Sequence, residues 1–401
     1  MTSDSFPSER FRAALSDAGL PEDFSVAREP QVVPAALLGD IGDFVRVFDR
    51  VTAREAWRAA ALSGAPAIAQ APRRELCFFS AWDFHLPAEG GFQLIEFNDN
   101  GSCFMFASII NALYYDVAEG KRVHGIAPPP SISAFRATIA GLVEREAQAF
   151  FGGRPEGLVL VLDDAQSLTS GKFRREHRLL CDLLGERGWE TAIASPERTR
   201  CDGGSLTVGG RPASFVVNRS TDFFWASDAF APLREAYASG RLYVAPNPFT
   251  YAVRSDKGLM ALLSSSDRDR ELGIEADERR ILTAHVPETH VLNERNADTL
   301  ADRKADFVFK PRRGFASRGL IDSAAVGRAR LRRMVRQGAL YVAQKRIAKP
   351  AIHSGGADLW TDLRVWAFRG EILQLSGRAS RRSDRLDLAP PGGWLPTYVS
   401  A

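Results

Sequence analysis

A continuous apolar run is the feature that most constrains how this chain can fold. Residues 158–162 read Leu-Val-Leu-Val-Leu and are followed by two aspartates. A strand is apolar at every position when both faces of its sheet are covered, which is typical of parallel strands. An amphipathic helix over 173–187 follows, and then apolar strands over 190–194 and 215–217. This order predicts an α/β fold that contains a small, doubly wound unit.

Ligands of doubly wound units bind beyond the carboxyl ends of the strands. The third strand of this unit ends in Asn218-Arg219-Ser220-Thr221-Asp222. Asn218, Arg219 and Asp222 are therefore candidate substrate-binding residues. The same residue types also form turns and cap helices, so a purely structural role is the alternative.

A β-hairpin is predicted over residues 75–98, with strands over 76–86 and 92–98 and a turn at Pro87-Ala88-Glu89-Gly90-Gly91. Glu96 and Asn98 are two positions apart and share a face, and pairing of the strands brings Asp83 opposite residues 94–97. Two carboxylates and an amide oxygen are ligands that Mg²⁺ prefers. Asp83, Glu96 and Asn98 are the candidate metal ligands. The alternative, an exposed polar face, would leave two acids among aromatic residues without a counter-charge.

A short apolar strand ends at Lys310 and leads into a loop with two glycines five positions apart and three arginines. Glycines allow backbone amides to approach an anion closely, and the cations neutralise it, so the segment suits a polyphosphate. It is not a P-loop, because no Gly-Lys-Ser/Thr follows the glycines. A surface turn is the alternative. The residues of this segment assigned to phosphate binding are Lys310, Arg313, Gly314, Ser317 and Gly319.

Lysine is rare in this chain, since only seven of its 52 Lys and Arg residues are lysines. Arginine is the default cation, so a lysine at the end of an apolar strand indicates a selected point charge. Lys257, in the first turn of a predicted helix, slightly opposes the helix dipole, and this favours a functional role for it as well.

Length and charge set further limits. The 401 residues predict two or three domains, and a net charge of +3 is too small to argue for nucleic acid or a membrane as partner. An arginine-rich helix over 328–336 lacks interleaved aromatic residues, so a solvated face is favoured over nucleic-acid binding. The four cysteines lie far apart, no run of about 18 apolar residues occurs, and a soluble cytoplasmic protein is expected. Oligomeric state stays open.

Four segments together resemble the ATP-grasp superfamily. They are Ser255-Asp256-Lys257, Val308-Phe309-Lys310-Pro311, Val342-Ala343-Gln344 and Asp362-Leu363-Arg364-Val365. Glu96-Phe97-Asn98 precedes them all, whereas the corresponding metal motif usually follows them. That order resembles the circularly permuted branch, which includes glutathionylspermidine synthetase.

The resemblance implies a circularly permuted ATP-grasp fold with a Rossmann-like unit. It implies three parts: residues 1–152 with the metal-binding hairpin, residues 156–245 as the substrate unit, and residues 246–401 as the nucleotide-binding lobes. The implied reaction joins a carboxylate to an amine through an acyl phosphate, with ATP and Mg²⁺. The implied roles are ATP phosphate binding by Lys257 and Lys310, an adenine pocket at Gln344, Lys345 and Ile347, and stabilisation of the acyl phosphate by Arg364 and Arg378.

One position departs from the family pattern. The synthetase carries an arginine two residues before its metal-binding aspartate, and this chain has Ala81 there. Arg364 or Arg378 could replace that cation, or the substrate could differ. Two other functions stay open: a small-molecule kinase that stops after phosphoryl transfer, and an ATP-binding module without turnover. The identities of the carboxylate and the amine are not determined by the sequence.

Overall fold

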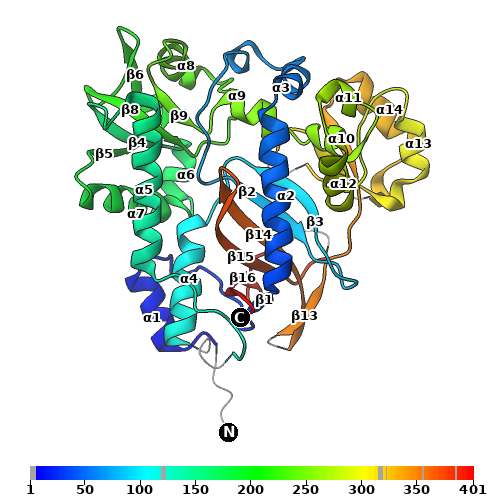
Figure 1. The fold of residues 1–401 in the computed structure, drawn as a ribbon, viewed down its shortest axis with the longest axis horizontal. Helices are drawn as coiled ribbons and strands as arrows, with labels where there is room; N and C mark the ends of the chain where they lie inside the picture. Colours follow the sequence, from blue (N-terminus) through cyan, green and yellow to red (C-terminus); the bar gives the residue numbers. More distant parts are fainter. Residues whose placement is uncertain (1–5, 119–122, 315–318, 322, 355, 384–385) are drawn as a thin grey trace.

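Three larger sheets, a two-stranded sheet and their helices build the described part of the molecule. The computed structural model describes residues 6–118, 123–314, 319–321, 323–354, 356–383 and 386–401. A central sheet lies between a doubly wound unit on one side and a smaller lobe on the other (Figure 1). No helix in these ranges is long and apolar enough to cross a membrane.

The central sheet joins distant parts of the chain. Its strand order is β16-β15-β14-β2-β3, β13 also pairs with β14, and every pair is antiparallel. Strands from the segments 1–152 and 246–401 therefore share one sheet, with β14 and β2 at the junction. The bounds are β2 Ala81–His85, β3 Gln93–Asn98, β13 Ala351–Ser354, β14 Ala357–Phe368, β15 Glu371–Ser380 and β16 Gly393–Leu395.

The predicted hairpin is present, but its first strand is shorter than expected. It begins at Ala81, because the chain makes a turn closed by the hydrogen bond from Ser80 N to Cys77 O. A bulge between Asp83 and Phe84 shifts the register, so that Asp83 pairs with Glu96.

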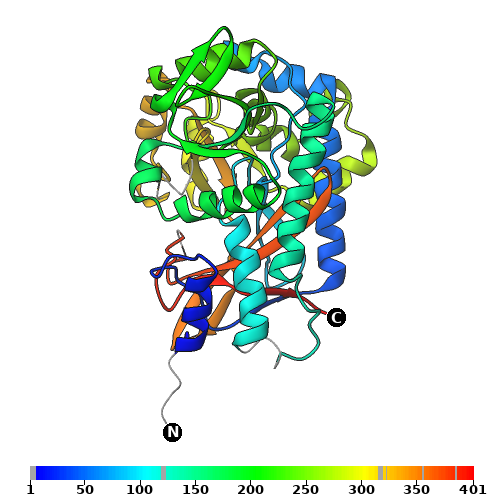
Figure 2. The same ribbon diagram turned by 90° about the vertical axis from the view of Figure 1, so that its left-hand side faces the viewer.

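Helices cover both faces of the central sheet. On one face, Phe48 of α2 (Ala35–Ala53) packs against Trp82 and Phe97, and Phe44 packs against Phe84. On the other, α4 (Phe104–Val117) packs near Trp366. Figure 2 shows α4 in cyan beside the longer α5. The helix α5 (Ile132–Phe151) begins where Ser131 Oγ accepts a hydrogen bond from Ala134 N and ends at a left-handed glycine.

The doubly wound unit contains the apolar run. Its parallel strands have the order β5-β4-β8-β9, and β7 and β6 extend β8. Alternate side chains of β4 face two hydrophobic cores, one against α5 and α7 and one against α8. The prediction of a strand covered on both faces is confirmed. The bounds are β4 Leu158–Leu162, α6 Ala165–Ser170, α7 Arg174–Glu186, β5 Thr191–Ala194, β6 Thr199–Asp202, β7 Ser205–Val208, β8 Arg211–Asn218, α8 Ala231–Ala238 and β9 Tyr243–Ala245.

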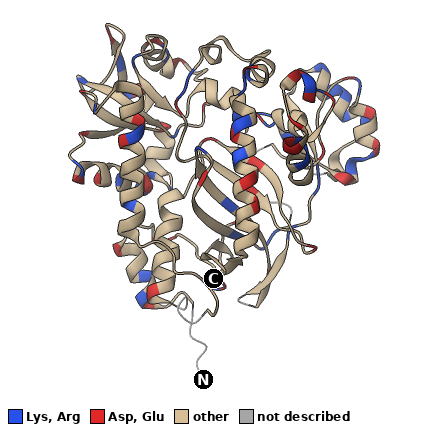
Figure 3. Ribbon diagram, viewed as in Figure 1, with Lys and Arg blue, Asp and Glu red and all other residues tan. Residues whose placement is uncertain are grey.

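The smaller lobe carries the lysine-bearing strand. Its sheet has the order β10-β12-β11, in Thr289–Val291, Tyr341–Lys345 and Phe307–Pro311. Helices α13 (Ala297–Asp302) and α14 (Arg328–Arg336) cover it. Arg328 of α14 pairs with Asp302 at 2.6 Å and Arg332 pairs with Asp298, and Figure 3 shows both signs of charge on this lobe. Two of the five arginines of α14 thus pair with acids of α13 at the surface, which fits the predicted solvated face.

The remaining elements connect these units. A two-stranded parallel sheet joins β1 to β17 near the C-terminus. The π-helix η5 (Tyr251–Ser255) leads from the doubly wound unit into the helices before the smaller lobe. The other bounds are α1 Glu9–Asp17, β1 Gln31–Val33, α3 Glu55–Leu62, α9 Pro248–Thr250, α10 Leu259–Ser264, α11 Asp269–Leu272, α12 Ala276–His285 and β17 Thr397–Val399.

Replacing Phe44 by alanine tests the packing of α2 on the central sheet. Phe44 is fully buried and contacts Phe84 and Phe92 edge to face. We expect a loss of about 3–5 kcal/mol in the free energy of unfolding, because the ring leaves a cavity. Urea unfolding measures it, with Leu340→Ala as control, since Leu340 is 46% exposed. Equal effects of the two substitutions would contradict this packing.

Candidate active site

One face of the central sheet carries a row of charged side chains. Arg364 of β14 pairs in register with Asp83 of β2, and Asp83 pairs with Glu96 of β3. Asn98 lies two positions beyond Glu96, on the same face. Its Nδ2 is 3.0 Å from Glu96 Oε1 and 3.5 Å from Asp83 Oδ2. The structure thus brings the three predicted metal ligands together.

Asp83 is the centre of a buried ion-pair network. Arg364 donates to its two oxygens at 2.6 and 2.7 Å, and Arg378 Nη2 lies 3.0 Å from Oδ2. Arg378 also forms a two-pronged pair with Asp362 at 2.9 and 2.8 Å. Burial alone would raise the pKa of Asp83, but the two guanidinium groups hold it well below its usual range. The carboxylate is therefore ionised at neutral pH.

Two lysines, the buried Lys257 and the half-buried Lys310, face the carboxylates from the other side. Lys257 Nζ lies 3.4 Å from Glu96 Oε2 and donates to Gly314 O at 2.7 Å. Lys310 Nζ donates to Gln344 Oε1 at 2.7 Å. It also lies 3.4 Å from the carbonyl oxygen of residue 95, in the strand that carries Glu96. The early hairpin and the late strand therefore meet, more than two hundred positions apart in the sequence. A small cleft between them is lined by Ile95, Lys257, Met260, Thr289, Lys310, Val342 and Gln344.

Burial and mutual charge set the protonation of these groups. Burial, with a further contribution from Lys257, lowers the pKa of Lys310 to about 8, although Glu96 opposes the shift. Burial would raise the pKa of Glu96, but Lys257 and Lys310 hold it below its usual value. The lysines are short of negative charge in this state, since two cations face one nearby carboxylate. An anionic ligand would correct that imbalance.

The glycine-rich loop after Lys310 is fixed at its base. Arg312 donates to Asp256 at 2.9 and 3.1 Å, and Arg313 Nε lies 3.5 Å from the same carboxylate. Gly319 has φ +75°, and a Cβ there would lie 2.7 Å from Pro311, so this position requires glycine. Ser317 lies outside the described residues.

The residues predicted to line an adenine pocket follow one another along the end of β12. Gln344 is buried and bonded to Lys310, whereas Lys345 is exposed. The carbonyl of Ile347 accepts a hydrogen bond from His85 Nδ1 at 3.1 Å. Burial, together with Lys349, lowers the pKa of His85 to about 3, so the ring is neutral at pH 7. Of the three residues predicted to line the adenine pocket, Gln344 lines the cleft.

Two of the three residues predicted to bind substrate stabilise their own loop. Asn218 Oδ1 accepts hydrogen bonds from Ser220 N and Oγ at 3.1 and 2.8 Å, and its amide donates to Pro246 O. Asp222 accepts a hydrogen bond from Ser227 N at 2.9 Å. Both therefore have the turn-forming contacts that the sequence allowed as the alternative.

Arg219 differs from these two because its side chain reaches the central sheet. Its Nη2 donates to Gly101 O at 3.0 Å, and its guanidinium lies over the ring of Phe79 at 4.2 Å. The residue is 6% exposed, and its Nε and Nη1 have no hydrogen-bond partner among the described residues. Glu176 is 4.0 Å away, but its carboxylate accepts from the backbone at the start of α4. Arg219 retains hydrogen-bonding capacity for a ligand.

The family's arginine is replaced in this chain by Ala81, which is closely packed. Ala81 is fully buried and pairs with Asn98 and Trp366 across the sheet. A Cβ at Gly101 would lie 2.5 Å from the Cβ of Ala81. The loop at Gly101 thus occupies the space beside Ala81. The cations that contact Asp83 are Arg364 and Arg378 instead.

Sequence reasoning missed two acids that orient arginines near the site. Asp362 fixes Arg378, and Asp256 fixes Arg312. Both belong to segments that resemble ATP-grasp motifs, and Asp362 alternates with Arg364 along β14. That alternation was a usable signal for a shared face, although it does not show which arginine each acid contacts.

Comparison with known proteins identifies the fold. Neither a protein-family model nor a curated protein sequence matches the chain. A solved structure of a glutathione synthetase-like effector (GSS30) from Globodera pallida matches with a TM-score of 0.60 at 10% identity, over 97% of this chain and 95% of that one. This chain has the fold of a glutathione synthetase-like protein. The predicted α/β fold is thereby confirmed, and it is shared with this glutathione synthetase-like structure.

Two further structures are more distant. A putative gamma-glutamylcysteine synthetase from Methylobacillus flagellatus matches with a TM-score of 0.49 at 12% identity, over 89% of this chain and 87% of that one. The ATP-grasp ligase PsnB, solved with a minimal precursor, matches with a TM-score of 0.31 at 13% identity, over 60% of this chain and 89% of that one. At these identities, likeness concerns the fold and leaves the activity to the site itself.

Replacing Arg364 by methionine tests the buried network. We expect a loss of about 3–5 kcal/mol at pH 7, because Asp83 would stay buried with one of its cations removed. The folded-state pKa of Asp83 is depressed, so its stabilisation is present above the unfolded pKa of about 4 and is lost as the pH falls below that value. The difference between variant and wild type should therefore shrink toward pH 3.

Thermal and urea unfolding at pH 7 and near pH 3 provide the measurement. Arg280→Met is the matched control, because Arg280 pairs with Asp277 on the surface at 74% and 84% side-chain exposure. It should change the unfolding free energy by less than about 0.5 kcal/mol. A pH-independent loss in the Arg364 variant would contradict the role given to Asp83.

Proposed function

We propose that this protein is an ATP-dependent carboxylate–amine ligase of the circularly permuted ATP-grasp kind. One observation carries the proposal: the carboxylates of Asp83 and Glu96 pair across two neighbouring strands, and the ammonium groups of Lys257 and Lys310 face Glu96 and its strand. Such a site matches what a nucleoside triphosphate and a metal require, namely cations for the phosphates and hard oxygens for the metal. The fold shared with a glutathione synthetase-like protein supports it.

The donor set fits magnesium. Glu96 offers a carboxylate, Asn98 offers its amide oxygen, and Asp83 retains lone pairs beside the two arginines. Among the described residues, no group of three His, Cys, Asp or Glu side chains could hold a metal. The amide and the phosphate oxygens of ATP would thus complete the coordination, as is common for Mg²⁺. When bound, magnesium would neutralise and orient the phosphates.

In this proposal different residues bind the phosphates and the adenine of ATP. Lys257 and Lys310 neutralise the phosphates. We expect the loop after Gly314 to cover them; its residues 315–318 lie outside the described residues. The end of β12 receives the adenine. A closed loop would exclude water, which otherwise hydrolyses an activated acyl group. The proposed nucleotide contacts are Lys257, Lys310, Arg313, Gly314, Ser317, Gly319, Gln344, Lys345 and Ile347.

The proposed chemistry has two steps. An oxygen of the substrate carboxylate attacks the γ-phosphorus of ATP, and ADP leaves. The amine nitrogen then attacks the acyl carbon, phosphate leaves and the amine loses a proton. Arg364 and Arg378, held by Asp83 and Asp362, would stabilise the negative charge that develops on the acyl phosphate and its tetrahedral successor. The open N–H groups of Arg219 would bind the carboxylate end of a substrate.

A binding module without turnover is the second candidate. Both oxygens of Asp83 already accept hydrogen bonds from guanidinium groups, and Ala81 lacks the cation that the related synthetase has. A site of this kind would bind ATP with magnesium and release no ADP. The two candidates differ in one measurable outcome, the release of ADP with a suitable acid and amine.

Turnover tests the ligase proposal. We expect ADP release that requires both an acid and an amine, and mass spectrometry should detect the condensation product. Lys310→Met and Glu96→Gln should each lower kcat/KM by about 10²–10³, because each removes a charge from the site of phosphoryl transfer. Lys172→Met is the control, since Lys172 is 61% exposed and pairs with a surface aspartate.

The possible results separate the candidates. Full turnover in both site variants would show that the site is elsewhere. ADP release without amine, with a stable phosphorylated product, would indicate a kinase. ATP binding without any ADP release across the substrate screen would indicate the binding module.

Proton uptake on ATP binding provides a test that does not need the substrates. The pKa of Lys310 is lowered to about 8, so this group is largely neutral at pH 8.5 in the free protein. Triphosphate beside it would raise that pKa, and binding at pH 8.5 should therefore take up as much as about one proton. Titration calorimetry in buffers of different ionisation enthalpy measures the uptake. Lys310→Met should remove it, and uptake that persists in this variant would contradict the assignment.

A further inference from the structure

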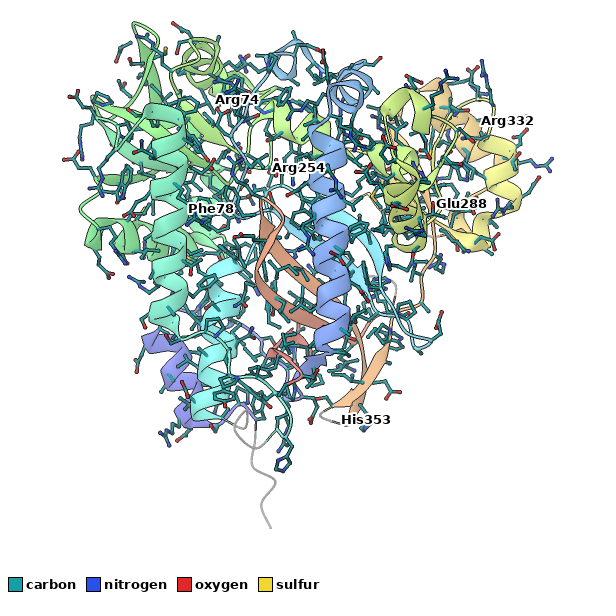
Figure 4. The ribbon with its side chains drawn as sticks, viewed as in Figure 1. Arg74, Phe78, Arg254, Glu288, Arg332 and His353 are labelled. Atoms are coloured by element: carbon teal, nitrogen blue, oxygen red, sulfur yellow. The ribbon has the colours of Figure 1, made fainter. Side chains whose placement is uncertain are left out.

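A second cavity lies on the opposite face of the central sheet. Its volume is about 520 Å³, and it lies between α2, α3, the segment before β2 and the π-helix η5. In Figure 4, Arg254 lies beside the upper part of α2, and Arg74 lies above it. The lining residues are Arg46, Asp49, Thr52, Ala53, Arg58, Arg73, Arg74, Leu76, Phe249, Thr250, Val253, Arg254, Arg369 and Gly370.

This cavity is separate from the candidate active site. The guanidinium of Arg254 lies 4.9 Å from the ring centroid of Phe97 and 5.6 Å from that of Phe48. Phe97 points toward α2, whereas its neighbour Glu96 points to the charged face. The sheet itself therefore stands between the two sites.

Among the described lining residues, arginines far outnumber acids. Six arginines line the cavity and Asp49 is the one acid. Four of the arginines have an acidic partner, inside or beside the cavity: Arg46 with Asp43, Arg73 with Glu75 at 3.6 Å, Arg254 with Asp49 at 2.7 Å, and Arg369 with Glu146 at 2.7 Å.

The other two arginines, Arg58 and Arg74, have no ion-pair partner in the described part of the chain. The cluster therefore keeps two positive charges that protein groups leave unneutralised. Burial, with Arg254 as the nearby like charge, lowers the pKa of Arg58. An anion between these guanidinium groups would relieve that repulsion.

Buried donors point to a ligand as well. Arg254 is 7% exposed, and its Nε is buried without a hydrogen-bond partner. Nε of Arg58 is also buried without a hydrogen-bond partner. Unsatisfied N–H groups of charged side chains are costly inside a protein, and guanidinium forks match the oxygens of phosphate and carboxylate. Leu76, Phe249 and Val253 add an apolar wall.

We propose that this cavity is a binding site for a small organic phosphate. A phosphate monoester carries about −1.5 to −2 charges at pH 7, which matches the two unneutralised arginines, whereas a single carboxylate carries one. The apolar wall suits the organic part, and the volume lies in the range of small-molecule sites. The proposal is independent of the ligase assignment, because it uses none of the proposed nucleotide contacts.

Titration calorimetry with phenyl phosphate, without ATP or magnesium, tests the site. We expect saturable binding that Arg58→Ala/Arg74→Ala weakens at least tenfold. The control Arg10→Ala/Arg178→Ala removes the same charge from exposed positions and should leave binding unchanged. Lys310→Met should also leave it unchanged, which separates this cavity from the candidate active site.

Three results would overturn the proposal. They are no binding of phenyl phosphate, equal binding in the Arg58/Arg74 variant, and loss of binding in Lys310→Met. Succinate serves as the dicarboxylate comparison, and binding as tight as that of phenyl phosphate would overturn the assignment to phosphates.

Thermal unfolding distinguishes a ligand site from a structural cluster. At low ionic strength the Arg58/Arg74 variant should have a melting temperature equal to or above that of wild type, because unneutralised charge is removed. Phenyl phosphate should raise the melting temperature of wild type and not that of the variant. A lower melting temperature of the unliganded variant would show that the arginines stabilise the fold, and would overturn the proposal.

Discussion

The buried ion pair between Asp83 and Arg364 connects two strands that lie far apart in the sequence. It joins β2, near residue 83, to β14, near residue 364. Arg378 and Asp362 extend the network to β15. Buried pairs repay their desolvation only when their geometry is good and their hydrogen bonds are satisfied, and both conditions are met here. The charged face of the sheet depends on this network.

The same network leaves few negative charges for the two lysines that face it. Asp83 is neutralised by arginines, so Glu96 is the carboxylate that faces Lys257 and Lys310. Burial and the nearby charge of Lys257 lower the pKa of Lys310. A cleft arranged in this way has a deficit of negative charge that triphosphate can fill, and a set of oxygens that magnesium can use.

The π-helix η5 connects this cleft to the arginine-lined cavity. Arg254 lies in the cavity, Ser255 accepts the backbone hydrogen bond of Asp99 after β3, and Lys257 enters the cleft two positions later. π-Helices are rare and are frequent at functional sites. The segment 254–257 thus contributes to both faces of the central sheet.

Local pattern alone determined the parallel strand at 158–162 and the hairpin around residues 87–91, because alternation and apolar runs are properties of neighbouring residues. It also gave the shared face of Glu96 and Asn98. Composition singled out two rare lysines as candidate site residues. The tertiary structure decided which distant strands pair, that Asn218 and Asp222 hold their own loop, and that Arg219 reaches Gly101. It decided as well that Arg58 and Arg74 line one cavity, in which the one acid, Asp49, pairs with Arg254. Such contacts join residues far apart in the chain, and their partners follow from packing and charge in three dimensions, which no sequence period encodes.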